Sequence, residues 1–249
     1  MKQLSKPPVL STICCIAGML CLFFRQWLLG SALDADGLLI IWHPINILIW
    51  VLTALVGIVL LVLFFTWDKQ LVCQFPFTPL SGTATLFMAV GYAVAAYPLL
   101  FDPTYYLDMV TGIFALLAIL CTLLIALGQF LKLRMHPLLY CPGVLFFMLY
   151  LLASYPLWSG EPQPQFFFFQ MMACVFLLLS VFTRAEMAAG RIAGRNYTIF
   201  SRAAIFLCIA AIPHSDRALL YAIFAVGLLL DGCRTVKRQP KNPPPESGE

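Results

Sequence analysis

Long apolar runs separated by short polar segments make up most of this chain of 249 residues. A helix needs about 20 mostly apolar residues to cross the hydrocarbon core of a bilayer. Eight runs reach or approach that length: Val9–Leu29, Ile45–Trp67, Thr83–Phe101, Met109–Leu131, Leu138–Trp158, Phe166–Thr183, Asn196–Pro213 and Arg217–Val236. The pattern predicts an all-α integral membrane protein with eight transmembrane helices.

The links between these runs are short, so we expect consecutive helices to pack as four antiparallel hairpins. Residues 1–236 are predicted to form a single polytopic transmembrane bundle, with no room for a separate soluble domain. Residues 237–249 are polar and contain Pro240 and Pro243–Pro245, which predicts a disordered cytoplasmic tail.

The first apolar run follows Lys2 and Lys6, an arrangement that also occurs in signal peptides. The run continues past Arg25 as far as Leu29, which is long enough to span a bilayer. We therefore expect an uncleaved first helix.

Composition supports a lipid environment. Hydrophobic residues make up 62% of the chain and charged residues 10%, whereas soluble proteins average about 25% charged residues. A soluble domain with so few polar groups could not cover its own surface. The net charge of +4 does not indicate nucleic-acid binding, because the basic residues follow the expected membrane topology.

Lysine and arginine are distributed unevenly between the two sides of the predicted bundle. With the N-terminus placed inside, 13 of them fall on the inner side: Lys2, Lys6, Lys69, Lys132, Arg134, Arg184, Arg191, Arg195, Arg202, Arg234, Lys237, Arg238 and Lys241. Only Arg25 and Arg217 fall on the outer side. Cytoplasmic loops carry such an excess of positive residues. We therefore expect a multi-pass protein of the cytoplasmic membrane with both termini in the cytoplasm.

A short motif recurs near the ends of predicted helices. Tyr92-x-x-Ala-x-Tyr-Pro-Leu99 is followed 58 residues later by Tyr150-x-x-Ala-x-Tyr-Pro-Leu157, and a degenerate copy covers Leu207–Pro213. This spacing indicates repeated two-helix hairpins. The alternative is that Tyr-Pro is a common way to finish a helix at a membrane interface.

Two charged residues fall inside the last two predicted helices. Arg202 lies ten residues before Ile212, and Asp231 lies 14 residues after Arg217, so each is buried deeper than the membrane edge. Measured from Ser215, both lie at a similar depth. We therefore predict an intramembrane ion pair between Arg202 and Asp231, which either neutralises two charges in lipid or acts as a charge switch or anion site.

Four arginines, Arg184, Arg191, Arg195 and Arg202, are spaced by 7, 4 and 7 residues. If the segment is one helix, they fall within about 20° of a single line. Such a stripe is a candidate site for phosphate or for anionic lipid headgroups. The alternative is a basic cytoplasmic loop required by topology, and a turn within the segment would break the stripe.

Known catalytic patterns are missing from the sequence, including H-E-x-x-H, the P-loop and the G-x-S-x-G elbow. We expect no catalytic residue, no metal ligand and no cofactor. Enzymatic activity is therefore the weakest of the functions considered.

Three functions stay open. The first is a non-catalytic membrane protein that senses, scaffolds or regulates, with anionic lipid headgroups at the cytoplasmic face and a partner membrane protein as binding partners. The second is a small-solute or lipid transporter or permease subunit, and the third is a membrane enzyme acting on a lipid headgroup. A filled apolar core would favour the first, and a polar cavity lined by Gln129, Gln170 or Arg202 would favour the second. Convergence of the arginines in a cytoplasmic pocket would favour a lipid or phosphate ligand.

Overall fold

Helices dominate the computed structural model of the protein, which describes residues 7–31, 42–67, 71–74, 79–133, 135–159, 165–191, 193–213, 215, 217–231 and 234–237. Its eight α-helices are α1 (Pro7–Ser31), α2 (Pro44–Thr66), α3 (Pro79–Phe101), α4 (Tyr106–Phe130), α5 (Cys141–Ser159), α6 (Gln165–Ala188), α7 (Gly194–Ala211) and α8 (Ala218–Leu230). A 3-10 turn, Pro137–Tyr140, precedes α5. The tail predicted to be disordered lies, from residue 238 onward, outside the described residues.

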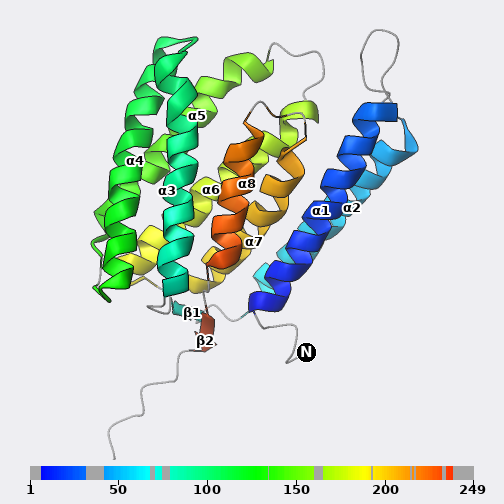
Figure 1. The fold of residues 1–249 in the computed structure, drawn as a ribbon. Helices are drawn as coiled ribbons and strands as arrows, with labels where there is room; N and C mark the ends of the chain where they lie inside the picture. Colours follow the sequence, from blue (N-terminus) through cyan, green and yellow to red (C-terminus); the bar gives the residue numbers. More distant parts are fainter. Residues whose placement is uncertain are drawn as a thin grey trace, which may run out of the picture.

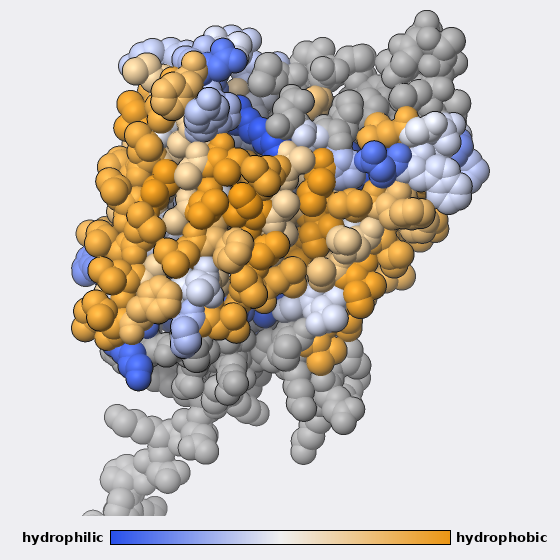
Figure 2. All heavy atoms as spheres, in the orientation of Figure 1, coloured by the Kyte–Doolittle hydropathy of each residue, from blue (hydrophilic) through white to orange (hydrophobic). Residues whose placement is uncertain are grey.

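Six of these helices, α1 to α6, are long and apolar enough to cross a membrane. Consecutive helices also pack together from α1 to α2 and from α3 onward to α8. Figure 2 shows hydrophobic side chains across the middle of one face and hydrophilic ones gathered towards its upper and lower ends. The chain is therefore a helical, multi-pass membrane protein.

Helix α7 lies at the centre of the bundle. It packs against α6, α1, α8 and α2, and Figure 1 shows it between the α1–α2 pair on one side and α3 and α4 on the other. Fifteen of its 18 residues are buried. It is therefore surrounded by protein along most of its length.

Helix α2 lies at the edge of the bundle (Figure 1). Only four of its 23 residues are buried: Asn46, Ile49, Val56 and Leu60. Large apolar side chains such as Ile58 and Phe65, which are 61% and 74% exposed, cover its other faces. This helix therefore presents most of its surface to the membrane.

The last predicted run divides into a shorter helix and a strand. Helix α8 ends at Leu230, and Asp231 caps it with a backbone N–H that donates to the Gly227 carbonyl over 3.1 Å. Strand β2 (Arg234–Lys237) then pairs antiparallel with β1 (Leu71–Gln74), which lies in the link after α2. The helix prediction to Val236 was therefore too long, because polar residues follow Leu230 and the chain there forms strand hydrogen bonds.

A tight turn separates α6 from α7. The N–H of Arg191 donates to the Glu186 carbonyl and that of Gly190 to the Met187 carbonyl, each over 3.0 Å. This is the Schellman arrangement, which requires a left-handed residue at its centre. Gly190 supplies it with a φ of 83°, so the arginine-rich segment is two helices and not one.

The recurring Tyr-Pro motif occupies equivalent places in α3 and α5. The first tyrosines, Tyr92 and Tyr150, are each 3% exposed, whereas the second, Tyr97 and Tyr155, are 69% and 66% exposed. Each proline lies inside the last turn of its helix, so the helix continues about one turn beyond it. The two copies therefore share orientation as well as sequence.

Candidate functional site

A buried ion pair joins α6 to the end of α8. Arg184 Nη1 lies 3.9 Å from Asp231 Oδ2, and both side chains are almost fully buried. Tyr197 of α7 donates a hydrogen bond from its hydroxyl to the same carboxylate oxygen. One acid is therefore shared between a cation and a phenol from different helices, which compensates its charge inside the protein.

Arg184 also reaches α3. Its Nη2 donates to Thr85 Oγ1 over 3.4 Å, and its Nη1 lies 3.8 Å from Met88 Sδ. Thr85 Oγ1 in turn lies 2.9 Å from Gln129 Oε1 of α4, to which Ser81 also donates over 3.2 Å. The resulting network joins α3, α4, α6, α7 and α8 through polar groups, at the end of the bundle where β1 and β2 pair (Figure 1).

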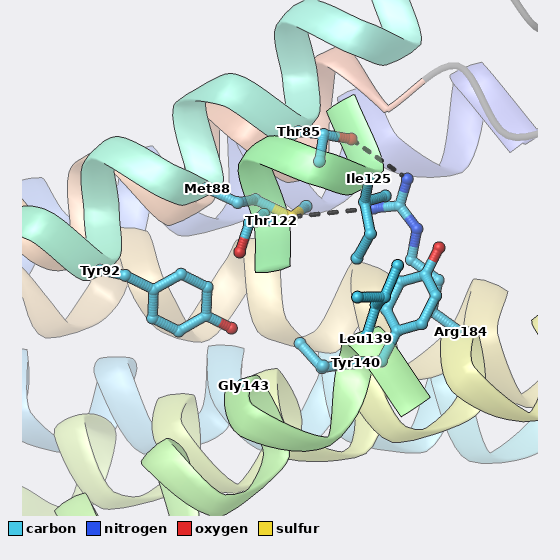
Figure 3. Close-up of a pocket in the computed structure, with 10 residues that line it drawn as sticks. Thr85, Met88, Tyr92, Thr122, Ile125, Leu139, Tyr140, Gly143 and Arg184 are labelled. Atoms are coloured by element: carbon cyan, nitrogen blue, oxygen red, sulfur yellow. Dashed lines mark hydrogen bonds between the residues drawn. The ribbon is translucent and has the colours of Figure 1, made fainter. Parts of the chain in front are cut away.

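A small cavity lies beside the guanidinium group of Arg184 (Figure 3). Its volume is about 30 Å³, which is the share of liquid volume of a single water molecule. It is lined by Thr85, Met88, Tyr92, Thr122, Ile125, Leu139, Tyr140, Gly143, Val181 and Arg184. Figure 3 shows Arg184 extending past the ring of Tyr140 towards Thr85 and Met88.

Arg202 lies on α7 and is only 2% exposed. Its Nη1 donates to Ser201 Oγ over 2.8 Å, and its Nε has no hydrogen-bond partner in the described chain. Arg202 was predicted to pair with Asp231, but the guanidinium within 4.0 Å of that carboxylate in the described residues belongs to Arg184. Arg184 occupies this place because α6 continues to Ala188 and carries it into the bundle.

The four arginines of the predicted stripe have four different environments. Arg184 and Arg202 are buried, whereas the side chain of Arg191 is 77% exposed and lies 3.9 Å from Glu186. The guanidinium of Arg195 lies over the Phe64 ring of α2, 4.4 Å from its centre. The turn at Gly190 breaks the predicted stripe. Arg184 lies on α6 and Arg191 follows the turn, whereas Arg195 and Arg202 share one face of α7.

Two further arginines lie near the opposite ends of these helices. Arg25 of α1 is 5% exposed, donates to the Ala210 carbonyl of α7, and lies 4.6 Å from the centre of the Phe169 ring. Arg217 lies 5.0 Å from the centre of the Tyr150 ring. Aromatic faces attract such cations, so these contacts fix α1 and the start of α8 to the bundle.

Tyr197 and Thr85 were not predicted as partners in the network. Arg184 was assigned to a basic link because the apolar run ends at Thr183. The following residues, Ala185 to Ala188, are good helix formers, and Gly190 is a strong stop signal. Together they would have placed Arg184 inside the helix.

A larger, apolar cavity of about 380 Å³ lies between α2, α6 and α7, on the other side of α7 from the ion pair. Its lining contains no charged residue: Thr53, Val56, Gly57, Leu60, Leu61, Phe64, Phe168, Met172, Phe176, Ile199, Phe200, Ala203, Phe206 and Leu207. Thr53, the one polar side chain among them, donates to the Ile49 carbonyl over 2.8 Å. This cavity, which we call the apolar groove, therefore suits a hydrocarbon and not a polar solute.

The chain matches no protein-family model, no curated protein and no solved structure.

Proposed function

We propose that this protein is a non-catalytic membrane protein that senses, scaffolds or regulates within the cytoplasmic membrane. In this proposal all eight helices cross the bilayer and both termini lie in the cytoplasm. The observation that carries it is the network around Arg184 and Asp231, which uses buried polar groups to join five helices. Polar groups that hydrogen-bond between helices in this way stabilise their packing.

The two cavities described above also favour this function over transport. The cavity beside Arg184 is small, about 30 Å³, and the groove beside α2 is apolar. A solute path would need polar groups that line a water-filled cavity near the bilayer midplane. Arg202, the best candidate for such a group, is enclosed by protein.

Two observations support membrane crossing by α7 and α8. Helix α7 has 18 residues, about 27 Å at 1.5 Å per residue, close to the roughly 30 Å of a bilayer core. It packs along α1, which is itself a candidate span. The pairing of β1 with β2 holds the link after α2 and the chain after α8 on one side, so α7 and α8 either both cross or both do not.

Hydrogen–deuterium exchange of the purified protein in detergent micelles tests this function. We expect the backbone amides of α7 to exchange about tenfold or more slowly than those of α2, because opening of a helix surrounded by protein requires disruption of the whole bundle. The turn at Ala189–Arg191 provides an internal reference for fast exchange. A water-filled path along Arg202 would reverse the order of α7 and α2, and would favour a transporter.

A further inference from the structure

The apolar groove between α2, α6 and α7 resembles a binding site for one extended hydrocarbon chain. Leu60 and Phe64 of α2 form one wall, Met172 and Phe176 of α6 form the opposite wall, and Phe200 and Phe206 of α7 lie at its base. Helix α2 packs only lightly on α7. The space between them is therefore not closed by side chains of the described residues.

Aromatic contacts mark both ends of this groove. At one end the ring of Trp50 packs on that of Phe168, with 5.0 Å between their centres. At the other end the guanidinium of Arg195 lies over Phe64. The groove is thus apolar along its length. Arg195 at one end is partly exposed, whereas Arg25, which lies over Phe169 near the other end, is buried and donates to the Ala210 carbonyl. The accessible cation therefore lies at one end, as an amphipathic ligand with an anionic headgroup requires.

The dimensions of the groove suit a lipid chain. Thr53 and Phe64 lie 11 positions apart on α2, about 16 Å, or roughly half the bilayer core. A hydrocarbon chain about 5 Å across would need on the order of 300 Å³, which is close to the observed 380 Å³.

The charges near the Arg195 end favour an anionic headgroup. Arg195 and Arg202 lie seven residues apart on α7, within about 20° of one line. In the part of the chain that the structure describes, neither arginine has a carboxylate within 4.0 Å. Arg202 is buried, but Arg195 is partly exposed, and such a cation attracts an anion more strongly than a zwitterion.

We propose that this groove binds one acyl chain of an anionic phospholipid, with the headgroup phosphate at Arg195. The inference rests on the proposed function in one respect, since the proposed orientation places the Arg195 end in the cytoplasmic leaflet. It names the ligand that a sensing or scaffolding protein of this architecture recognises. Binding itself does not depend on that orientation.

Native mass spectrometry of the full-length protein tests the proposal, with phosphatidylglycerol and phosphatidylcholine as the two probes. The wild-type protein should retain one phosphatidylglycerol molecule in preference to phosphatidylcholine. Arg195→Gln should lower that preference about fivefold, the effect of removing one cation near an anionic lipid. Gly57→Phe should lower retention of both lipids, because a side chain added at Gly57 meets open space at the groove and would fill it.

Two control variants change the same properties away from the groove. Arg191→Gln removes an exposed arginine of the neighbouring turn, and Ile58→Phe adds bulk to the exposed face of α2. Both should bind lipid like the wild type. Unchanged retention in Gly57→Phe, or unchanged headgroup preference in Arg195→Gln, would overturn the proposal. A change in oligomeric mass in Gly57→Phe without loss of lipid would assign the groove to a protein partner instead. Slow exchange in α7 would leave the proposed function standing in either case.

Discussion

Helices α2 and α7 are buried to very different extents, and in neither helix does the extent of burial follow from how apolar its sequence is. Helix α2 is the most apolar of the candidate spans, yet only four of its 23 residues are buried. Helix α7 falls outside the set of candidate spans and contains Arg195, Asn196 and Arg202, yet 15 of its 18 residues are buried. Apolarity and burial in the protein are therefore inversely related in this pair.

The difference reflects the solvent that each helix meets. A helix that faces lipid must be apolar, because hydrocarbon satisfies no polar group. A helix enclosed by other helices can carry polar side chains, provided that the protein supplies their partners. In α7 these include Asp231 for Tyr197 and the neighbouring Ser201 for Arg202. In this pair of helices, polar residues therefore accompany the central position of α7, and the strongly apolar sequence accompanies the peripheral position of α2.

The largest effect should come from breaking the ion pair beside α7. Asp231→Ala should lower the free energy of unfolding by about 3–5 kcal/mol, because it leaves Arg184 buried without its acid. Arg191→Ala, which removes the exposed partner of Glu186, should cost less than about 1 kcal/mol. Unfolding by SDS in mild-detergent micelles measures both.

A double-mutant cycle identifies which arginine is the partner of Asp231. We expect a coupling energy above about 1.5 kcal/mol between Asp231→Ala and Arg184→Ala, and a smaller one between Asp231→Ala and Arg202→Ala. The opposite order would support the Arg202–Asp231 pair predicted from the sequence.

A second prediction compares matched isoleucines in the two helices. Ile205 of α7 is fully buried and Ile58 of α2 is 61% exposed. Ile205→Ala should destabilise the protein by about 2–5 kcal/mol, because the cavity that it leaves lies inside the packed core. Ile58→Ala should cost less than about 0.5 kcal/mol, because lipid or detergent replaces the lost contacts. Equal effects in the same SDS titration would mean that α7 is not the central helix.

The smallest effect concerns the close approach of α1 to α7. A Cβ atom added at Gly18 would lie 3.0 Å from Ile209 Cβ and 3.2 Å from the Phe206 carbonyl oxygen. Gly18→Leu should therefore cost about 1–3 kcal/mol through overpacking. Gly57→Ala on α2 meets nothing within 4 Å and should cause no loss. A thermal-unfolding series in micelles compares the two, and a tolerated Gly18→Leu would place α1 farther from α7.

Hydropathy predicted where most helices lie along the chain, but it did not predict how deeply each helix is buried in the bundle. The first six runs match α1 to α6 within a few residues, because lipid-facing helices need long apolar sequences. The eighth run failed at its end, because the strand pair with Leu71–Gln74 is a non-local contact. No local pattern near Arg234–Lys237 indicates that distant partner. The position of α7 at the centre also depends on contacts with the whole bundle.

The candidate site was predicted only in part. The depth of Asp231 in the last apolar run led to the expectation of an ion pair, but the choice of its partner depended on where α6 ends. The stop signal at Gly190 was present in the sequence, and it separates Arg184 from Arg195. The contributions of Tyr197 and Thr85 could not be predicted, because hydroxyl groups of this kind are common in membrane helices.

The pairing of β1 with β2 has a consequence for biosynthesis. Gln74 pairs with Arg234, which lies 160 residues later in the chain (234 − 74). A ribosome adds about 5–20 residues per second, so this interval takes roughly 8–32 s. Throughout that time the hydrogen-bonding edge of β1 has no strand to pair with, and an open edge of this kind can pair with other chains. The pairing of β1 with β2 is therefore among the last contacts to form, and it follows the synthesis of all eight helices.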